Sequence, residues 1–218
     1  MRKAGDLIAE YMREKVLAEN RQTPIGRGTY GVVFPSDVSG NVIKQATFND
    51  EFGATLNEAS RQAVAAELGI APRVASVETF PGGIGNRIEM EDIRQNYHPI
   101  EGPNRQLEGQ VAVDTAKQQG MLALRGVALD DRHSGNVFIH NLTGRPKQID
   151  FGISYNLMGD YGKANALANA TAEGFEAAGM KDIADIYRAT VMDLLEGGQE
   201  KEAYDVARQG FSRLQKIK

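Results

Sequence analysis

The feature that most constrains the fold is a set of three glycines that separates two short apolar segments near the N-terminus. The run Gly26-Arg27-Gly28-Thr29-Tyr30-Gly31-Val32-Val33 fits the pattern G-x-G-x-x-G-x-V. Val32 and Val33 continue as a strand, whereas a dinucleotide-binding β-α-β unit needs a helix after the last glycine. Glycines let a backbone approach phosphates closely and leave its N–H groups unobstructed. The context favours a strand-loop-strand lid over ATP, with an ordinary glycine-rich hairpin as the alternative.

Length and composition exclude several classes of protein. The 218 residues suit one domain or two small lobes. The absence of cysteine excludes a disulfide scaffold, a thiolate metal site and a cysteine nucleophile, and is compatible with a reducing cytoplasm. A net charge of −4 gives no global attraction to nucleic acid or anionic membrane. No apolar run is long enough for a membrane span, so we expect a cytoplasmic protein that binds neither partner.

The hydrophobic pattern changes character along the chain. Residues 1–22 have the apolar spacing of an amphipathic helix. Residues 23–95 read as short strands with one helix, and residues 96–218 read as helices with one hairpin. The Pro- and Gly-containing segment 96–104 is the natural hinge between them. The pattern predicts an α+β fold with a small antiparallel sheet followed by a mainly helical region.

A lysine that can bind phosphates and a glutamate that can pair with it follow the glycine run. Lys44 is near the end of the next expected strand, where its ammonium group can reach nucleotide phosphates. Glu58 lies in the helix expected over residues 55–68 and can hold that ammonium by an ion pair. Glu51 and Glu67 remain alternative partners.

A third group of residues is the most specific. Asp131 precedes Asn136 by five residues, between an expected helix and an expected hairpin, and Asp150-Phe151-Gly152 follows that hairpin. The hairpin brings Asn136 and Asp150 to neighbouring strand ends. Two oxygen ligands at such a place can hold Mg²⁺ while substrate phosphates complete its coordination. Asp131 is then left to accept a hydroxyl proton.

In this order and spacing, the motifs resemble those of the protein-kinase-like superfamily over residues 23–153. The resemblance implies a two-lobed fold in which Asp131, Lys44 and Glu58 are catalytic. It implies that Asn136 and Asp150 bind Mg²⁺. In the family's pattern Met90 lines the nucleotide pocket, and the backbone of Glu91 and Ile93 binds adenine. The full set of ATP-binding residues implied in this way is Ile25, Gly26, Gly28, Gly31, Val33, Lys44, Met90, Glu91 and Ile93.

The chain also departs from the family's pattern. Leu129-Asp130-Asp131 stands where eukaryotic-type kinases have His-Arg-Asp, and of its two aspartates only Asp131 keeps the spacing to Asn136. With His133 two residues after Asp131, the run Asp-Arg-His-Ser-Gly-Asn resembles the Asp-x-His-x-x-Asn loop of aminoglycoside and choline kinases, which indicates a small-molecule substrate. No Ala-Pro-Glu motif follows Gly152, and the 66 remaining residues leave room for only a truncated C-lobe. This minimal form resembles small bacterial effector kinases or phage-encoded kinases.

We therefore expect an ATP- and Mg²⁺-dependent Ser/Thr protein kinase that acts on a protein substrate without activation-loop phosphorylation. Its expected location is the cytoplasm, or a host cytoplasm into which it is delivered. Two alternatives remain open at this stage. One is a phosphotransferase for small molecules, like the aminoglycoside and choline kinases, and the other is a pseudokinase that serves as a binding module.

Overall fold

The computed structural model divides the chain into two compact units, Met1–Gln95 and Asn96–Lys218. The structure describes residues 11, 14, 22–28, 31–47, 53–80, 85–100, 107–130 and 134–217. Both units combine helices with antiparallel strands, which confirms the expected α+β class with a small antiparallel sheet. The helix expected over residues 1–22 lies outside the described residues, apart from Tyr11, Glu14 and Gln22.

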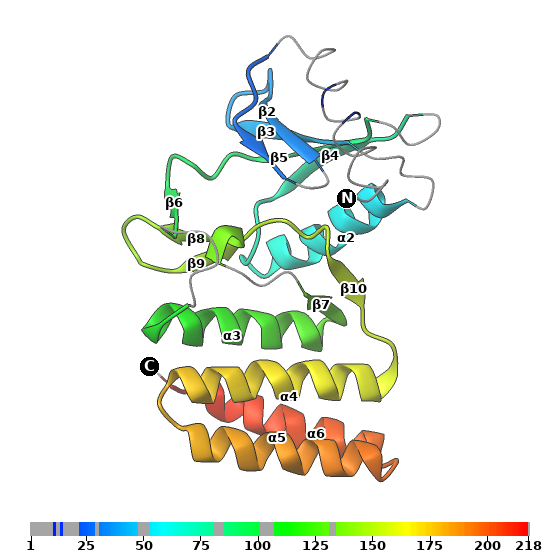
Figure 1. Cartoon of the computed structure of the whole chain (residues 1–218), viewed down its shortest axis with the longest axis vertical. Coiled ribbons are helices and arrows are strands. Elements are labelled where there is room, and N and C mark those ends of the chain that lie inside the picture. Colours follow the sequence, from blue (N-terminus) through cyan, green and yellow to red (C-terminus); the bar gives the residue numbers. More distant parts are fainter. Residues whose placement is uncertain are drawn as a thin grey trace, which may run out of the picture. The chain divides into compact units, whose positions relative to one another are not determined.

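Unit 1 is an antiparallel sheet of five strands, in the order β1-β2-β3-β5-β4, with the helix α2 (Figure 1). The bounds of its elements are β1 Gly26–Arg27, β2 Gly31–Pro35, β3 Asn41–Ala46, α2 Ala54–Glu67, β4 Val74–Glu78 and β5 Arg87–Glu91. The strands and helix expected from the sequence in this region are therefore present. Helix α2 packs against β4 and β5.

Helix α2 ends at a glycine because the chain must turn back toward the sheet. Gly69 has a φ of 73°, in the left-handed region that favours glycine. Its N–H bonds Ala66 O at 2.9 Å, and the Ile70 N–H bonds Ala65 O at 2.9 Å. This pair of bonds is a Schellman motif, which satisfies the last carbonyl groups of a helix. Ile70 is then buried, and the chain enters β4.

The strand register places a row of side chains on one face of the sheet. Val33 on β2 is opposite Lys44 on β3, and Lys44 is opposite Ile88 on β5. Val42 and Met90 form the next pair on this face, because alternate residues of a strand point to the same side. The same face therefore carries Lys44 and Met90.

Unit 2 is mainly helical, with two small antiparallel sheets (Figure 1). Strand β7 pairs with β10, and β8 pairs with both β6 and β9. The bounds are β6 Tyr97–Pro99, α3 Gly109–Leu124, β7 Val127–Leu129, the 3-10 turn η1 Ser134–Asn136, β8 Val137–His140, β9 Pro146–Gln148, β10 Ser154–Asn156, α4 Gly159–Ala177, α5 Lys181–Glu196 and α6 Glu200–Leu214. Strand β6 occupies part of the segment expected to be a hinge.

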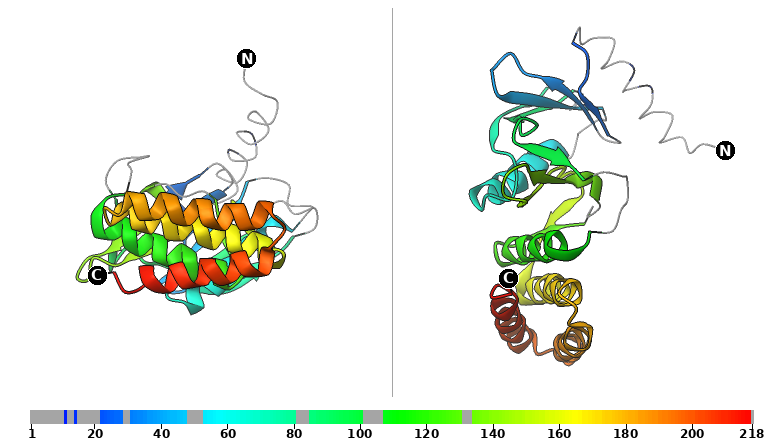
Figure 2. Two further views of the ribbon diagram at one scale, coloured as in Figure 1. Left: turned by 90° about the horizontal axis from the view of Figure 1, so that it is seen from below. Right: turned by 90° about the vertical axis from the view of Figure 1, so that its left-hand side faces the viewer.

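Helix α4 is the centre of the helical layer and packs against α3, α5 and α6 (Figure 2). Two helical glycines let α6 approach closely. A Cβ atom at Gly120 of α3 would lie 2.1 Å from the ring of Phe211, and one at Gly174 of α4 would lie 2.5 Å from Leu214. Phe211 and Leu214 are both buried in this core.

Helix α5 differs in one respect from its sequence pattern. The pattern places Ile183 and Ile186 on the apolar face with Val191 and Leu195. In the structure Val191 and Leu195 are buried, whereas Ile183 is 52% exposed and Ile186 is 69% exposed. The buried face is rotated toward Ala184, so the two isoleucines lie outside the contact with α4 and α6. Within the described residues, no helix has the length and apolarity needed to cross a membrane.

Candidate functional site

The described glycines of this run lie on or beside β1 and β2, and Gly31 brings the main chain against Lys44. Gly26 pairs with Val33, and the Gly28 N–H bonds Gly31 O at 2.9 Å. A Cβ atom at Gly31 would lie 3.2 Å from Lys44 Cε and 3.1 Å from Gln45 O. A side chain at position 31 would therefore crowd Lys44 and the Gln45 carbonyl group, which favours glycine at this position.

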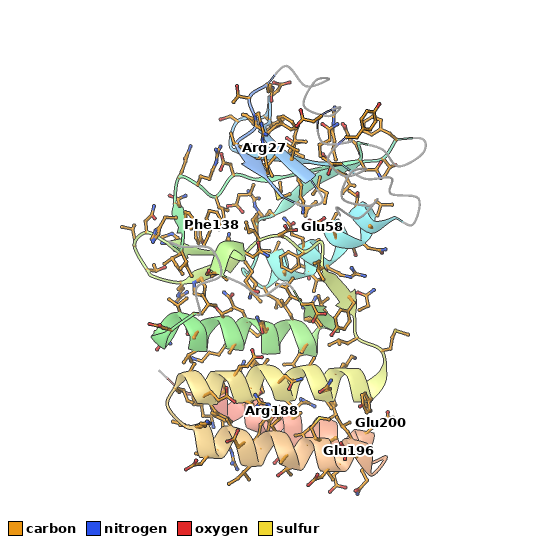
Figure 3. The ribbon with its side chains drawn as sticks, viewed as in Figure 1. Arg27, Glu58, Phe138, Arg188, Glu196 and Glu200 are labelled. Atoms are coloured by element: carbon orange, nitrogen blue, oxygen red, sulfur yellow. The ribbon has the colours of Figure 1, made fainter. Side chains whose placement is uncertain are left out.

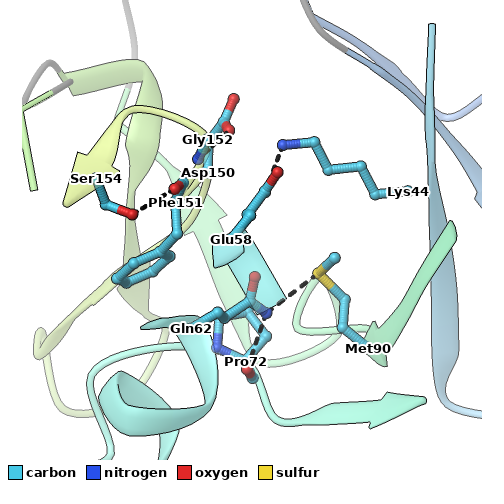
Figure 4. Close-up of polar contacts among 9 residues, drawn as sticks. All are labelled: Lys44, Glu58, Gln62, Pro72, Met90, Asp150, Phe151, Gly152 and Ser154. Atoms are coloured by element: carbon cyan, nitrogen blue, oxygen red, sulfur yellow. Dashed lines mark hydrogen bonds and ion pairs between the residues drawn. The ribbon is translucent and has the colours of Figure 1, made fainter. Parts of the chain in front are cut away.

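Lys44 is paired with Glu58. Lys44 Nζ lies 2.6 Å from Glu58 Oε1, and the two side chains are only 13% and 10% exposed (Figure 4). Glu58 reaches it from α2 (Figure 3). Of the three glutamates considered from the sequence, Glu58 is the one in this ion pair, while Glu51 lies outside the described residues. A charged pair shielded from water holds both groups in one geometry.

The remaining residues expected to bind adenine lie on or beside β1, β2 and β5. Val33 and Met90 are half-buried on the face of the sheet that carries Lys44. Ile93 is buried, and Ile25 is 36% exposed. The Glu91 N–H bonds Arg73 O at 2.9 Å. The expected contact of the Glu91 backbone with adenine is therefore restricted to its carbonyl group.

An arginine fixes the segment between Glu91 and Ile93. Arg94 Nε and Nη2 donate to the two carboxylate oxygens of Asp92 at 2.9 and 2.6 Å. These hydrogen bonds lower the pKa of Asp92, and the same contact raises the pKa of Arg94. The Asp92 N–H also bonds Gly40 O at 2.8 Å. These contacts give residues 91–94 a defined shape.

In unit 2, the β8-β9 hairpin brings Asn136 and Asp150 to neighbouring positions. Val137 is opposite Gln148, and the Ile149 N–H bonds Asn136 O at 2.9 Å. Asn136 and Asp150 both lie beyond the same end of this ladder, next to the pair of Val137 and Gln148. Asn136 is 8% exposed.

Asp150 has an unusual backbone. Its φ is 59°, in the left-handed region, and its Oδ1 accepts a hydrogen bond of 3.3 Å from the Gly152 N–H (Figure 4). Phe151 is fully buried, and Ser154 Oγ donates to Phe151 O at 2.6 Å. The Asp130 N–H bonds Ile153 O at 3.0 Å. The Asp-Phe-Gly turn is therefore held on both sides by hydrogen bonds.

The amide oxygen of Asn136 and the carboxylate of Asp150 are hard oxygen donors of the kind that Mg²⁺ prefers. Among the described residues, no group of three or more His, Asp or Glu side chains is placed to hold a metal ion. The pair therefore fits Mg²⁺ only as part of a shell that substrate phosphates and water complete. Asp131, expected to be the base, lies outside the described residues together with His133.

The sequence reasoning missed Gln62. Its Nε2 donates to Pro72 O at 3.0 Å and contacts Met90 Sδ at 3.4 Å. The available signal was its position four residues after Glu58, because residues at this spacing share one face of a helix. From sequence alone, a glutamine in a helix is predicted to be exposed to solvent, because the sequence does not show which face of the helix is buried.

A cavity of about 200 Å³ lies within unit 2, between α3, α4 and the β7-β10 pair. Its apolar lining includes Ala123, Leu129, Leu157 and Ala170, and its polar lining is Gln119, Asp130, Tyr155, Asn165 and Asn169. Asn169 Nδ2 donates to Asn165 Oδ1 at 3.1 Å. The cavity thus offers a small molecule both hydrogen-bonding groups and apolar contacts.

No model of a known protein family matches the chain, and no curated protein matches it by sequence.

Proposed function

We propose that the protein is an ATP- and Mg²⁺-dependent phosphotransferase with a two-lobed, kinase-like fold. The observation that carries this proposal is the shielded Lys44–Glu58 ion pair beside Gly31. A lysine held in this way presents a fixed positive charge to nucleotide phosphates, and glycines let the main chain approach those phosphates closely. In phosphoryl transfer, positioning and charge neutralisation supply most of the catalysis.

Unit 2 supplies the other half of the proposed chemistry. Asn136 and Asp150 are proposed to hold Mg²⁺, which neutralises charge that develops on the phosphates. Asp131 is proposed to accept the proton of the attacking hydroxyl group. The Lys44, Asn136 and Asp150 side chains are all present, which favours an active enzyme over a pseudokinase.

The proposed acceptor is a Ser or Thr hydroxyl group of a protein. Helix α4 begins at Gly159, only a few residues after Gly152. So short a connection has no room for a long phosphorylatable loop, which supports activity without such control.

The cavity in unit 2 supports a second candidate, transfer to a small hydroxylated molecule. Among the described residues that line it, Asp130 is the one with a charge, and it directly precedes Asp131 in the chain. A volume of about 200 Å³ suits a small polar ligand and not a folded protein surface. Labelled phosphate that appears on sugars or polyols, with none on protein, would select this candidate.

Calorimetric titration with ATP in the presence and absence of Mg²⁺ tests the shared step of both candidates. Wild-type protein is expected to bind MgATP, and Lys44→Met to bind it about ten- to a hundredfold more weakly, because a hydrogen bond to a charged group is lost. Lys201→Met, at an exposed site on α6, is the matched control and should bind like wild type. Absence of MgATP binding by the wild type, or unchanged binding by Lys44→Met, would contradict the proposal.

A further inference from the structure

Gln62 is a polar residue in a position that helices usually fill with an apolar one. It is 1% exposed and lies on the face of α2 that also carries Glu58. A buried amide is unfavourable by a few kcal/mol unless its polar atoms find partners. The hydrogen-bond partners of the Gln62 amide group therefore indicate its structural role.

Both contacts of the amide nitrogen leave α2 and reach other elements. Gln62 Nε2 donates to Pro72 O at 3.0 Å, in the segment that connects α2 to β4 (Figure 4). It also lies 3.4 Å from Met90 Sδ, on β5. An amide nitrogen carries two hydrogens, so it can serve both acceptors at once.

The two acceptors belong to parts of unit 1 that are themselves joined. Next to Pro72, Arg73 accepts a hydrogen bond from the Glu91 N–H, and Glu91 follows Met90 on β5. Met90 lies on the same face of the sheet as Lys44, since Lys44 pairs with Ile88 two residues earlier. Gln62 therefore holds α2 against β5, on the face of the sheet that also carries Lys44 of β3.

We propose that Gln62 is a positioning residue that holds α2 at the height and rotation at which Glu58 meets Lys44. Glu58 is one helical turn before Gln62, so a displacement at Gln62 moves the carboxylate as well. All of these contacts lie within unit 1, and the ion pair therefore assembles from this unit's own residues. The positioning itself can be measured without catalysis, while its effect on turnover rests on the proposed function.

The competing interpretation is that Gln62 is merely a hydrogen-bonded core residue. Its substitution would then lower the free energy of unfolding and leave the native Lys44–Glu58 geometry unchanged. The reactivity of the Lys44 amine separates the two interpretations, because an amine that is ion-paired and shielded reacts slowly with acylating reagents.

The test is the rate of acylation of individual lysines, measured by mass spectrometry on the folded protein. In Gln62→Met, which keeps the length of the side chain and removes its donors, Lys44 is expected to react several-fold faster than in wild type. Glu58→Gln serves as the positive reference for a Lys44 that has lost its ion pair with Glu58, and Gln62→Ala is a second variant. Lys117, a partly shielded lysine of unit 2, reports any general unfolding.

The matched control is Gln148→Leu, which removes a buried, hydrogen-bonded glutamine from unit 2. It should leave the Lys44 rate unchanged. An unchanged Lys44 rate in Gln62→Met and Gln62→Ala overturns the proposal, whatever the effect of Glu58→Gln. A faster Lys44 rate accompanied by an equal increase at Lys117 also overturns it, since general unfolding then explains both.

A second readout separates this proposal from the proposed function. If wild-type protein transfers phosphate, Gln62→Met should lower kcat about five- to tenfold and change the KM for ATP by less, as expected for a misplaced catalytic pair and the loss of about one hydrogen bond. Fast Lys44 acylation in Gln62→Met together with an inactive wild type would support positioning and reject the phosphotransferase. If the wild type is active, and Gln62→Met changes neither kcat nor the acylation rate of Lys44, the phosphotransferase is supported and the positioning role is rejected.

Discussion

Asp150 is the one non-glycine residue with a positive φ in the described part of the chain. This conformation is unfavourable by about 1–2 kcal/mol for an ordinary L-residue, but Asp and Asn tolerate it because their short side chains bond the local backbone. The Asp150 carboxylate does so with the Gly152 N–H. Residues held in sparsely populated conformations cluster at functional sites, which fits the role proposed for Asp150.

Two substitutions separate the backbone of Asp150 from its charge. Asp150→Asn keeps the tolerance for positive φ and should leave the free energy of unfolding nearly unchanged, whereas Asp150→Ala should lower it by about 1 kcal/mol. Urea denaturation of the two variants measures the difference. Equal stability of the two would show that the left-handed backbone carries no strain for alanine at this position.

At the scale of elements, glycine permits close helix packing as well as turns. Gly120, Gly174 and Gly210 each lie where a neighbouring large side chain leaves no room for a Cβ atom, and the partners are Phe211, Leu214 and Tyr187. Helix α6 is involved in all three contacts. Some of the chain's 24 glycines therefore serve the core of unit 2.

Gly174→Ala should destabilise the protein by about 1–3 kcal/mol, because the added methyl group overlaps Leu214 and outweighs the better helix propensity of alanine. The matched control is Gly162→Ala in the same helix, where the nearest atom would be 3.7 Å away. That variant should be as stable as wild type or up to about 1 kcal/mol more stable. Thermal denaturation compares them, and a neutral Gly174→Ala would contradict the packing described for α4 and α6.

The contact between α5 and α6 predicts a dependence of stability on alkaline pH. Burial raises the pKa of Tyr187 to about 12 from 10.0, and its hydroxyl donates to Ala207 O at 2.9 Å. The unfolded chain therefore loses this proton first, so the contribution to stability is complete below pH 10 and disappears as the pH rises toward 12.

Denaturation of wild type and Tyr187→Phe across this pH range provides the measurement. The wild type should lose about 2 kcal/mol more than the variant between these limits. Parallel curves for the two proteins would show that Tyr187 titrates normally, and would contradict its burial.

Sequence periodicity was sufficient to place most of these elements but not their contacts. The stop at Gly69, the β8-β9 hairpin and the helices of unit 2 follow from turn residues and apolar spacing. The exposure of Ile183 and Ile186 does not, because periodicity defines an apolar face without showing how much of it a neighbour covers. For the same reason a buried Gln62 could not be recognised among the polar residues of α2.

At the scale of the whole molecule, the candidate residues are distributed between the two units. Unit 1 holds the Lys44–Glu58 pair and the glycines of the G-x-G-x-x-G run, and unit 2 holds Asn136 and Asp150. The order of the motifs in the sequence predicts which candidate residues fall in each unit, because each motif lies on a local strand or turn. The pairing of Lys44 with Glu58 could be confirmed only in the structure, because Glu51 and Glu67 were also possible partners from the sequence.

The measurement that tests the central claim most directly is the transfer of labelled phosphate from ATP, with and without Mg²⁺, to proteins and to small molecules of a cell lysate. Wild-type protein is expected to label an acceptor only with Mg²⁺. Lys44→Met, Asp131→Asn and Asp150→Asn should each lose this activity, while Lys201→Met keeps it. Labelling that persists in all three variants, or a wild type that transfers no phosphate to any acceptor, would contradict the assignment of a phosphotransferase.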